Sequence, residues 1–188
     1  WIGKAGTDPR VVVISTTSPI KTFDEFLQQK EPQNFATSGL GSASYIEMIL
    51  LSKTMKLPIK VLTGYQGSGD QLAMRRGEIV GTIGSRSSLQ QFVNNGYGRF
   101  IAQIGGLESD VPQMSAWAKD EAGANSIALI QSQGDIARLT AGPPGIPADR
   151  LSTLIDAYRS ALNDPDLQAR AIKFGYPIEP AYGEDDAK

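Results

Sequence analysis

Small and hydroxyl-bearing residues gather in one stretch of the 188-residue chain, Thr37–Ser44, which reads Thr-Ser-Gly-Leu-Gly-Ser-Ala-Ser. Its two glycines would let the backbone come close to a ligand. A helix that begins directly after them would offer unpaired N–H groups and a positive dipole end, which suit a carboxylate or a phosphate. The alternative is a glycine turn followed by a serine that caps the helix.

Two further stretches have the same make-up, Thr63–Asp70 and Gly84–Ser88. In the first, Tyr65 either covers the apolar part of a ligand or packs beneath its own loop. In the second, Arg86 either pairs with an anion or is a solvated surface charge. Three successive stretches of this kind are harder to explain by turn chemistry than one, so they predict a binding site.

The same stretches offer little for catalysis. The chain has no Cys and no His, which excludes a thiol nucleophile, Ser–His hydrolysis and the usual zinc sites for this chain acting alone. Asp70 is the only acid in the three stretches. Dipoles and neutral hydroxyls bind a ligand but do not by themselves transfer protons. We therefore expect a binding protein rather than an enzyme, with no cofactor and no metal.

Nucleotides and nucleic acids are also poor candidates. Ser44 stands where a dinucleotide-binding loop needs its third glycine, and no Gly-Lys-Ser/Thr follows for a P-loop. The formal net charge is −2, from 18 Lys and Arg against 20 Asp and Glu, whereas nucleic-acid binders use a strong positive field. No apolar run approaches the roughly 20 residues that cross a bilayer, so we expect no direct membrane insertion.

Alternating patterns predict the elements that position these stretches. The short apolar runs that predict strands are Val11–Ile14, Asn34–Thr37, Ile59–Leu62, Ile79–Ile83 and Arg99–Ile104. Helical patterns separate them, over about residues 42–54, 69–76 and 87–93, and the capping-box spacing Thr22–Glu25 opens another helix. This alternation predicts an α/β fold whose parallel sheet is built from right-handed crossovers. Ligands bind such sheets at the carboxyl ends of the strands, where all three stretches would lie.

The regular alternation of strand and helix patterns ends after Gly105. Residues Met114–Gln131 contain helical material, and Ala137–Ala141 predicts a short strand before the breaker Gly142–Gly145. A helix should begin at Pro147, and another should run from Asp164-Pro165 to about Lys173. Residues 183–186 are typical of an acidic first helical turn, so we expect the chain to be part of a longer protein.

Four segments resemble, in order, a known family over about residues 1–180. They are Phe35–Ser42, Val61–Gly69, Arg76–Ile79 and Ala141–Pro147. The family comprises the solute receptors of tripartite tricarboxylate transporters, of the Bordetella-uptake type. The resemblance implies a type II periplasmic-binding-protein-like fold, with one full lobe of mostly parallel sheet flanked by helices over residues 8–134. Residues 135–188 would be the C-terminal part of the other lobe, without its N-terminal half and final helix.

The resemblance also implies a function. The protein would be an exported, periplasmic, monomeric receptor that binds a small carboxylate reversibly between two lobes and delivers it to membrane permease subunits. The expected ligand-binding residues are Thr37, Ser38, Gly39, Gly41, Ser42, Ser44, Tyr65, Gln66, Gly67, Ser68, Gly84 and Ser85. Two departures stand out: Tyr45 where members often have His, and Gly84-Ser85 where many have Asp, which argues against an amino-acid ligand.

Two other functions share this two-lobed architecture. One is the ligand-sensing effector domain of a transcription regulator, which would need a DNA-binding segment upstream. The other is an enzyme on the same scaffold, which would depend on residues outside this chain because it lacks His and Cys.

Overall fold

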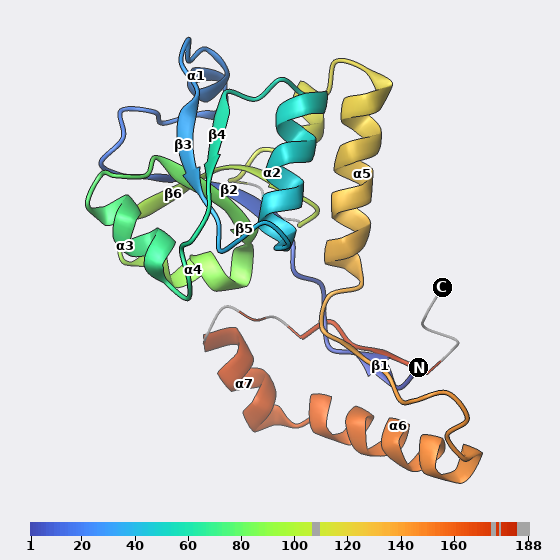
Figure 1. Ribbon diagram of the computed structural model, residues 1–188. Coiled ribbons are helices and arrows are strands. Elements are labelled where there is room, and N and C mark those ends of the chain that lie inside the picture. Colours follow the sequence, from blue (N-terminus) through green and yellow to red (C-terminus); the bar gives the residue numbers. More distant parts are fainter. Residues whose placement is uncertain (107–109, 174–175, 177, 184–188) are drawn as a thin grey trace. The chain divides into compact units, whose positions relative to one another are not determined.

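The computed structural model describes residues 1–106, 110–173, 176 and 178–183 (Figure 1). The chain forms two compact units. The larger unit is Pro9–Ser132, and the smaller one combines Trp1–Asp8 with Gln133–Lys188. The chain therefore passes between the units twice, after Asp8 and after Ser132.

The larger unit is built on a five-stranded sheet of order β4-β3-β5-β2-β6. Its strands are β2 (Arg10–Ser15), β3 (Gln33–Ala36), β4 (Ile59–Leu62), β5 (Gly81–Ser85) and β6 (Gly98–Ile104). β3 runs parallel to β4 and β5, whereas β2 runs antiparallel to both of its neighbours, β5 and β6. Four of the five strands therefore run in the same direction, which confirms the expectation of a mostly parallel sheet. The sheet is not fully parallel, because β2 runs in the opposite direction. That strand has neighbours far along the chain, so no single crossover fixes its direction.

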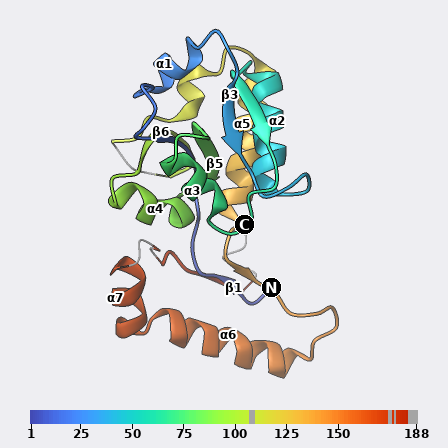
Figure 2. The same ribbon diagram turned by 60° about the vertical axis from the view of Figure 1, so that its left-hand side comes forward.

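Helices cover both faces of this sheet (Figures 1 and 2). On one face lie α1 (Phe23–Leu27), α2 (Ala43–Thr54) and α5 (Glu121–Asp135), with a short 3₁₀ helix at Met114–Trp117. On the other face lie α3 (Gly69–Arg75) and α4 (Arg86–Asn94). Alternate side chains of β2 enter the two cores, Val12 and Ile14 on one face and Val11 and Val13 on the other. The predicted strand buried on both faces is thus confirmed.

Local sequence sets the start of α1. The Thr22 hydroxyl accepts the Glu25 N–H at 3.1 Å at the start of α1, and the Glu25 carboxylate accepts the Lys21 N–H at 2.7 Å. This is the predicted capping box, except that the Glu25 carboxylate accepts from the N–H of Lys21 instead of that of the capping residue Thr22. β5 begins two residues later than the apolar run that predicted it, at Gly81.

The smaller unit contains a three-stranded antiparallel sheet of order β7-β1-β8 and two helices. Its strands are β1 (Gly3–Lys4), β7 (Leu139–Thr140) and β8 (Ala181–Tyr182), and its helices are α6 (Ala148–Leu162) and α7 (Pro165–Lys173). Arg138 and Asp8 form an ion pair at 2.8 Å within it. Pro147 caps α6 rather than opening it. The acidic turn expected at residues 183–186 lies mostly outside the described residues.

None of the helices in the described part of the chain is both long and apolar enough to cross a membrane.

Candidate functional site

The three predicted loops lie at one edge of the larger unit's sheet. Residues 37–42 follow β3, residues 63–68 follow β4, and β5 passes directly into α4 at Ser85. Because β3, β4 and β5 are adjacent and parallel, their carboxyl ends share that edge, and each leads into a helix. The expectation that the three stretches lie at the carboxyl ends of parallel strands is therefore confirmed; that they bind a ligand stays a prediction.

Backbone hydrogen bonds join the first two loops. The Gly64 N–H donates to the Ser38 carbonyl at 3.2 Å, and the Tyr65 N–H donates to the Thr37 carbonyl at 3.3 Å. The Gln66 side-chain amide also donates to the Ser38 carbonyl, at 3.3 Å. Ser38 and Gln66 are thus held together, although they lie 28 positions apart in the sequence.

The third loop is attached through side chains. The amide of Gln71, in α3, donates to the Ser88 carbonyl at 3.4 Å, and the Ser85 hydroxyl donates to the Ser88 hydroxyl at 2.8 Å. A β-carbon at Gly84 would lie 3.0 Å from the Leu89 side chain. Close packing therefore explains Gly84 without a ligand.

The hydroxyls of the first loop are already engaged. The Ser42 hydroxyl accepts the Tyr45 N–H at 3.2 Å, donates to the Gly39 carbonyl at 2.9 Å and lies 2.7 Å from the Thr37 hydroxyl, which is buried. The serine-cap interpretation thus describes Ser42, whose side chain shapes the loop. The loop presents the Ser38 and Leu40 side chains to solvent, Leu40 being 71% exposed, together with the backbone around its two glycines.

Open space lies in front of that backbone. A β-carbon built on Gly39 or on Gly41 would meet no atom within 4 Å, and neither residue has a positive φ. The fold itself therefore does not require glycine at these two positions. Gly64 and Gly67 differ, because their φ angles of +103° and +57° lie in the region that favours glycine.

Several donors at this edge lack a protein acceptor. Within the described ranges, no hydrogen bond engages the N–H groups of Gly41, Ala43 or Ser44, the last two of which open α2. Ser68 precedes α3 and is exposed, and its hydroxyl makes no capping bond. These groups can bind an anion without breaking any bond of the fold.

Two other predicted residues have roles within the fold. Tyr65 is half-buried and packs against the core cluster beneath α3 and α4, which favours the packing interpretation of its side chain. The Arg86 guanidinium lies 4.8 Å from the centre of the Phe100 ring.

The structure also places charged residues here that sequence reasoning missed. Arg10 begins β2, and because β2 is antiparallel this start lies at the edge where β3, β4 and β5 end. Its guanidinium bonds the Glu47 carboxylate in α2. Burial raises the pKa of Glu47, although the attraction and hydrogen bonds of Arg10 lower it in part. The only signal in the sequence was one charge at the start of an apolar run.

Groups for other chemistry are few. Burial raises the pKa of Asp70, whose carboxylate accepts the Gln71 N–H at 2.8 Å. In the part of the chain that the structure describes, no three acidic side chains gather where they could hold a metal ion. The site therefore fits binding of an anion better than proton transfer.

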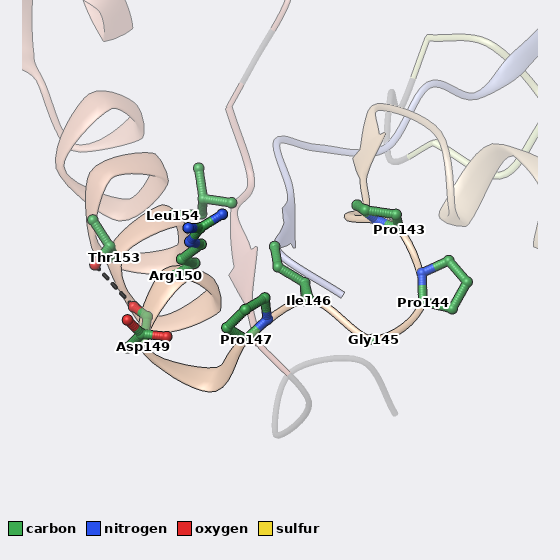
Figure 3. Close-up of a pocket in the computed structure, with 9 residues that line it drawn as sticks. All are labelled: Pro143, Pro144, Gly145, Ile146, Pro147, Asp149, Arg150, Thr153 and Leu154. Atoms are coloured by element: carbon green, nitrogen blue, oxygen red, sulfur yellow. Dashed lines mark hydrogen bonds between the residues drawn. The ribbon is translucent and has the colours of Figure 1, made fainter.

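A hollow of about 600 Å³ lies elsewhere, in the smaller unit (Figure 3). It is lined by the proline-rich turn Pro143–Pro147 and by Asp149, Arg150, Thr153 and Leu154 of α6. The Thr153 hydroxyl bonds the Asp149 carbonyl at 2.9 Å within the helix. None of the predicted binding residues lines this hollow.

Solved structures of periplasmic solute-binding proteins have this fold. A TctC solute binding protein from Polaromonas matches with a TM-score of 0.68 and 16% identity, over 98% of this chain and 62% of its own. MatC from Rhodopseudomonas palustris, solved with bound malate, matches with a TM-score of 0.65 and 18% identity over 93% and 58%. The periplasmic binding protein BugD matches with a TM-score of 0.64 and 16% identity over 94% and 58%.

The expected fold is therefore confirmed, and the similar structures are of the kind that the sequence resembles. The chain spans about three fifths of the length of these structures. No protein-family model and no curated protein sequence matches the chain.

Proposed function

We propose that this chain is the ligand-binding part of a periplasmic solute receptor of a tripartite tricarboxylate-type transporter. One observation carries the proposal: three adjacent parallel strands end in small-residue loops, where N–H groups without an acceptor stand beside two glycines that have open space next to them. The fold shared with periplasmic solute-binding proteins, among them one with bound malate, supports the same function. The ligand class is a small carboxylate.

The proposed mechanism uses backbone more than side chains. Carboxylate oxygens accept the N–H groups of Gly41, Ala43 and Ser44 and the hydroxyl of Ser68. The positive end of α2 contributes about 0.3–1 kcal/mol, and none of these contacts is covalent, so binding is reversible. Glycine at 39 and 41 leaves the ligand room, because a side chain there would project into the space it occupies.

In the whole protein, the ligand is held between two lobes, of which the Pro9–Ser132 unit is one. Closure follows from the extra contacts that the ligand makes in the closed state. The closed, monomeric receptor then passes the carboxylate to permease subunits in the membrane, without chemical change. Residues 135–188 belong in this scheme to the second lobe.

Amide NMR of the ¹⁵N-labelled chain tests this function. Titration with malate, and with a mono- and a tricarboxylate, should shift the amides of residues 39–44 and 67–69 more than any others. Binding by a single lobe is expected to be weak, at a Kd of about 1 mM or above, which amide shifts still detect.

Gly41→Ala is the variant that separates ligand binding from folding. Nothing in the fold opposes a methyl group there, so stability should stay the same or rise by about 0.4–1 kcal/mol. Malate affinity should fall about tenfold or more, because the methyl group projects into the ligand's place. Ser52→Ala, in α2 with its hydroxyl bonded to the Ile49 carbonyl, is the control. Unchanged malate affinity in Gly41→Ala, or shifts confined to residues 143–154, would contradict the proposal.

A further inference from the structure

One buried ion pair connects the first residue of β2 to the first turns of α2. Arg10 donates to the same Glu47 oxygen, Oε2, from Nε at 3.0 Å and from Nη2 at 2.7 Å. Nη2 also lies 3.4 Å from the Ser44 hydroxyl. The side chains are 13% and 2% exposed, so one guanidinium fixes two positions of α2 away from water.

This pair is a poor source of stability. Both of its close hydrogen bonds use Oε2, while Glu47 Oε1 is buried and has no hydrogen-bond partner among the described residues. Removing two charges from water is unfavourable, and well-packed apolar side chains often replace such pairs with no loss of stability. We therefore ask whether the ion pair fixes the orientation of α2 instead.

The sequence of α2 leaves that geometry undetermined. Met48 and Leu51 are fully buried, yet Ile46 is 57% exposed, so apolar residues lie on both sides of the helix. An amphipathic helix takes its rotation from its apolar stripe, and this helix has no single stripe. A directional contact is needed to select one rotation about the helix axis, and buried polar contacts are known to serve in this way.

The rotation of α2 decides where its first N–H groups point. Ser44, which the guanidinium approaches, carries one of the unbonded N–H groups, and Glu47 follows one turn later. Arg10 itself stands opposite Ser85 in the sheet, at the edge where the three loops lie. The contact thus spans the short distance between the sheet edge and the start of the helix.

We infer that Arg10 is a positioning residue of the carboxylate site: through Glu47 and Ser44 it sets the rotation of α2 and aims the N–H groups of its first turn. This inference rests on the proposed function. Arg10 acts without touching the ligand, and its planar guanidinium is suited to fixing orientation because its donors have fixed directions.

The test replaces both partners at once. Arg10→Met combined with Glu47→Leu removes the charges but keeps apolar bulk, so the melting temperature should stay the same or rise. Malate affinity should nevertheless fall about tenfold, and the amide resonances of Ala43 and Ser44 should shift even before malate is added. Arg76→Gln with Glu78→Gln, which removes an exposed ion pair of 2.6 Å in the same unit, is the control and should change neither.

A conservative variant keeps the test decisive if the double variant does not fold. Arg10→Lys retains the charge but not the fork of donors, and should weaken malate binding several-fold with little change in melting temperature. Malate affinity within about twofold of wild type in the folded variant, with unmoved Ala43 and Ser44 amides, would overturn the inference. A wild-type chain that shows no malate shifts overturns the proposed function instead, and the ligand-free amide shifts then decide whether Arg10 sets the rotation of α2.

Discussion

The two units of this chain bury their apolar residues to very different degrees. In the larger unit, both faces of the sheet are covered and aromatic residues pack together, with the Phe26 and Phe35 rings 5.3 Å apart. In the smaller unit, Ile2 and Leu162 are the only large apolar side chains buried among the described residues, and α7 buries none. Strands of two residues cannot form an extensive core, whereas a five-stranded sheet between two helical layers can.

The helices of the smaller unit show the same contrast, because their apolar residues stay exposed. α6 and α7 carry apolar residues at helical spacing, yet Leu154 is 43% exposed and Ile172 is 73% exposed. A correct amphipathic pattern is therefore not sufficient for burial. It needs an opposing surface, which the larger unit contains and the described part of the smaller unit lacks.

Truncation of single apolar side chains should show the largest difference between the units. Phe35→Ala, fully buried in the larger unit, should cost about 3–5 kcal/mol of unfolding free energy because it leaves a cavity. Ile172→Ala in α7 should change it by about 0.5 kcal/mol or less. Guanidinium unfolding followed by Trp117 fluorescence measures the first effect, since Trp117 packs on Phe23 at 4.6 Å between ring centres. Equal costs at the two positions would contradict the contrast in burial.

Hydrogen exchange should sharpen the contrast at the level of the backbone. Amides of Val12, Val13 and Ile14 lie between two paired strands and should exchange only through global unfolding. Amides in β1 and β7 should exchange about 100-fold faster or more, because strands of two residues open locally. Exchange measured by NMR at neutral pH gives both values on one sample, and similar protection in the two sheets would show that the smaller unit is as stable as the larger.

The smallest expected effect concerns Asp70 and the pH dependence of the larger unit. Burial raises the pKa of this carboxyl in the folded state, so the folded chain holds the proton more tightly than the unfolded chain. Its contribution favours folding at pH values below the ordinary aspartate pKa and is lost as the pH rises through the raised value.

Asp70→Asn keeps an oxygen for the Gln71 N–H and removes the charge. The variant should therefore be more stable than wild type at neutral pH, by less than about 1 kcal/mol because the carboxylate is only partly buried. The gain should disappear at acidic pH. Urea unfolding of both proteins at neutral and acidic pH measures this difference, and a gain that grows on acidification would contradict the assignment.

Sequence patterns predicted most elements of the larger unit because their apolar periodicity matches what the core requires. They could not predict the direction of β2, since the apolar run of a strand buried on both faces is the same for either direction. They missed β1 and β8 because two residues carry no periodicity.

At the candidate site, composition predicted where the loops lie, but it did not predict the role of each group within them. The glycine and hydroxyl content located all three loops, and the serine cap was one of two alternatives. That Ser42 bonds within its loop while the Gly41 backbone stays open depends on dihedral angles that no local pattern specifies. The Arg10–Glu47 contact joins residues 37 positions apart, so no local pattern could predict it.

The central place of β2 has a consequence for biosynthesis. Its pairing partners are residues 81–85 and 98–104, so about 70 further residues must leave the ribosome before its first neighbour is complete and about 90 before its second. Until then Val11–Ile14 is an unpaired, β-branched segment of the kind that nucleates aggregation, with Asp8, Pro9 and Arg10 before it and no charged residue directly after it. We therefore expect the nascent chain to need rapid completion, or a chaperone that shields β2.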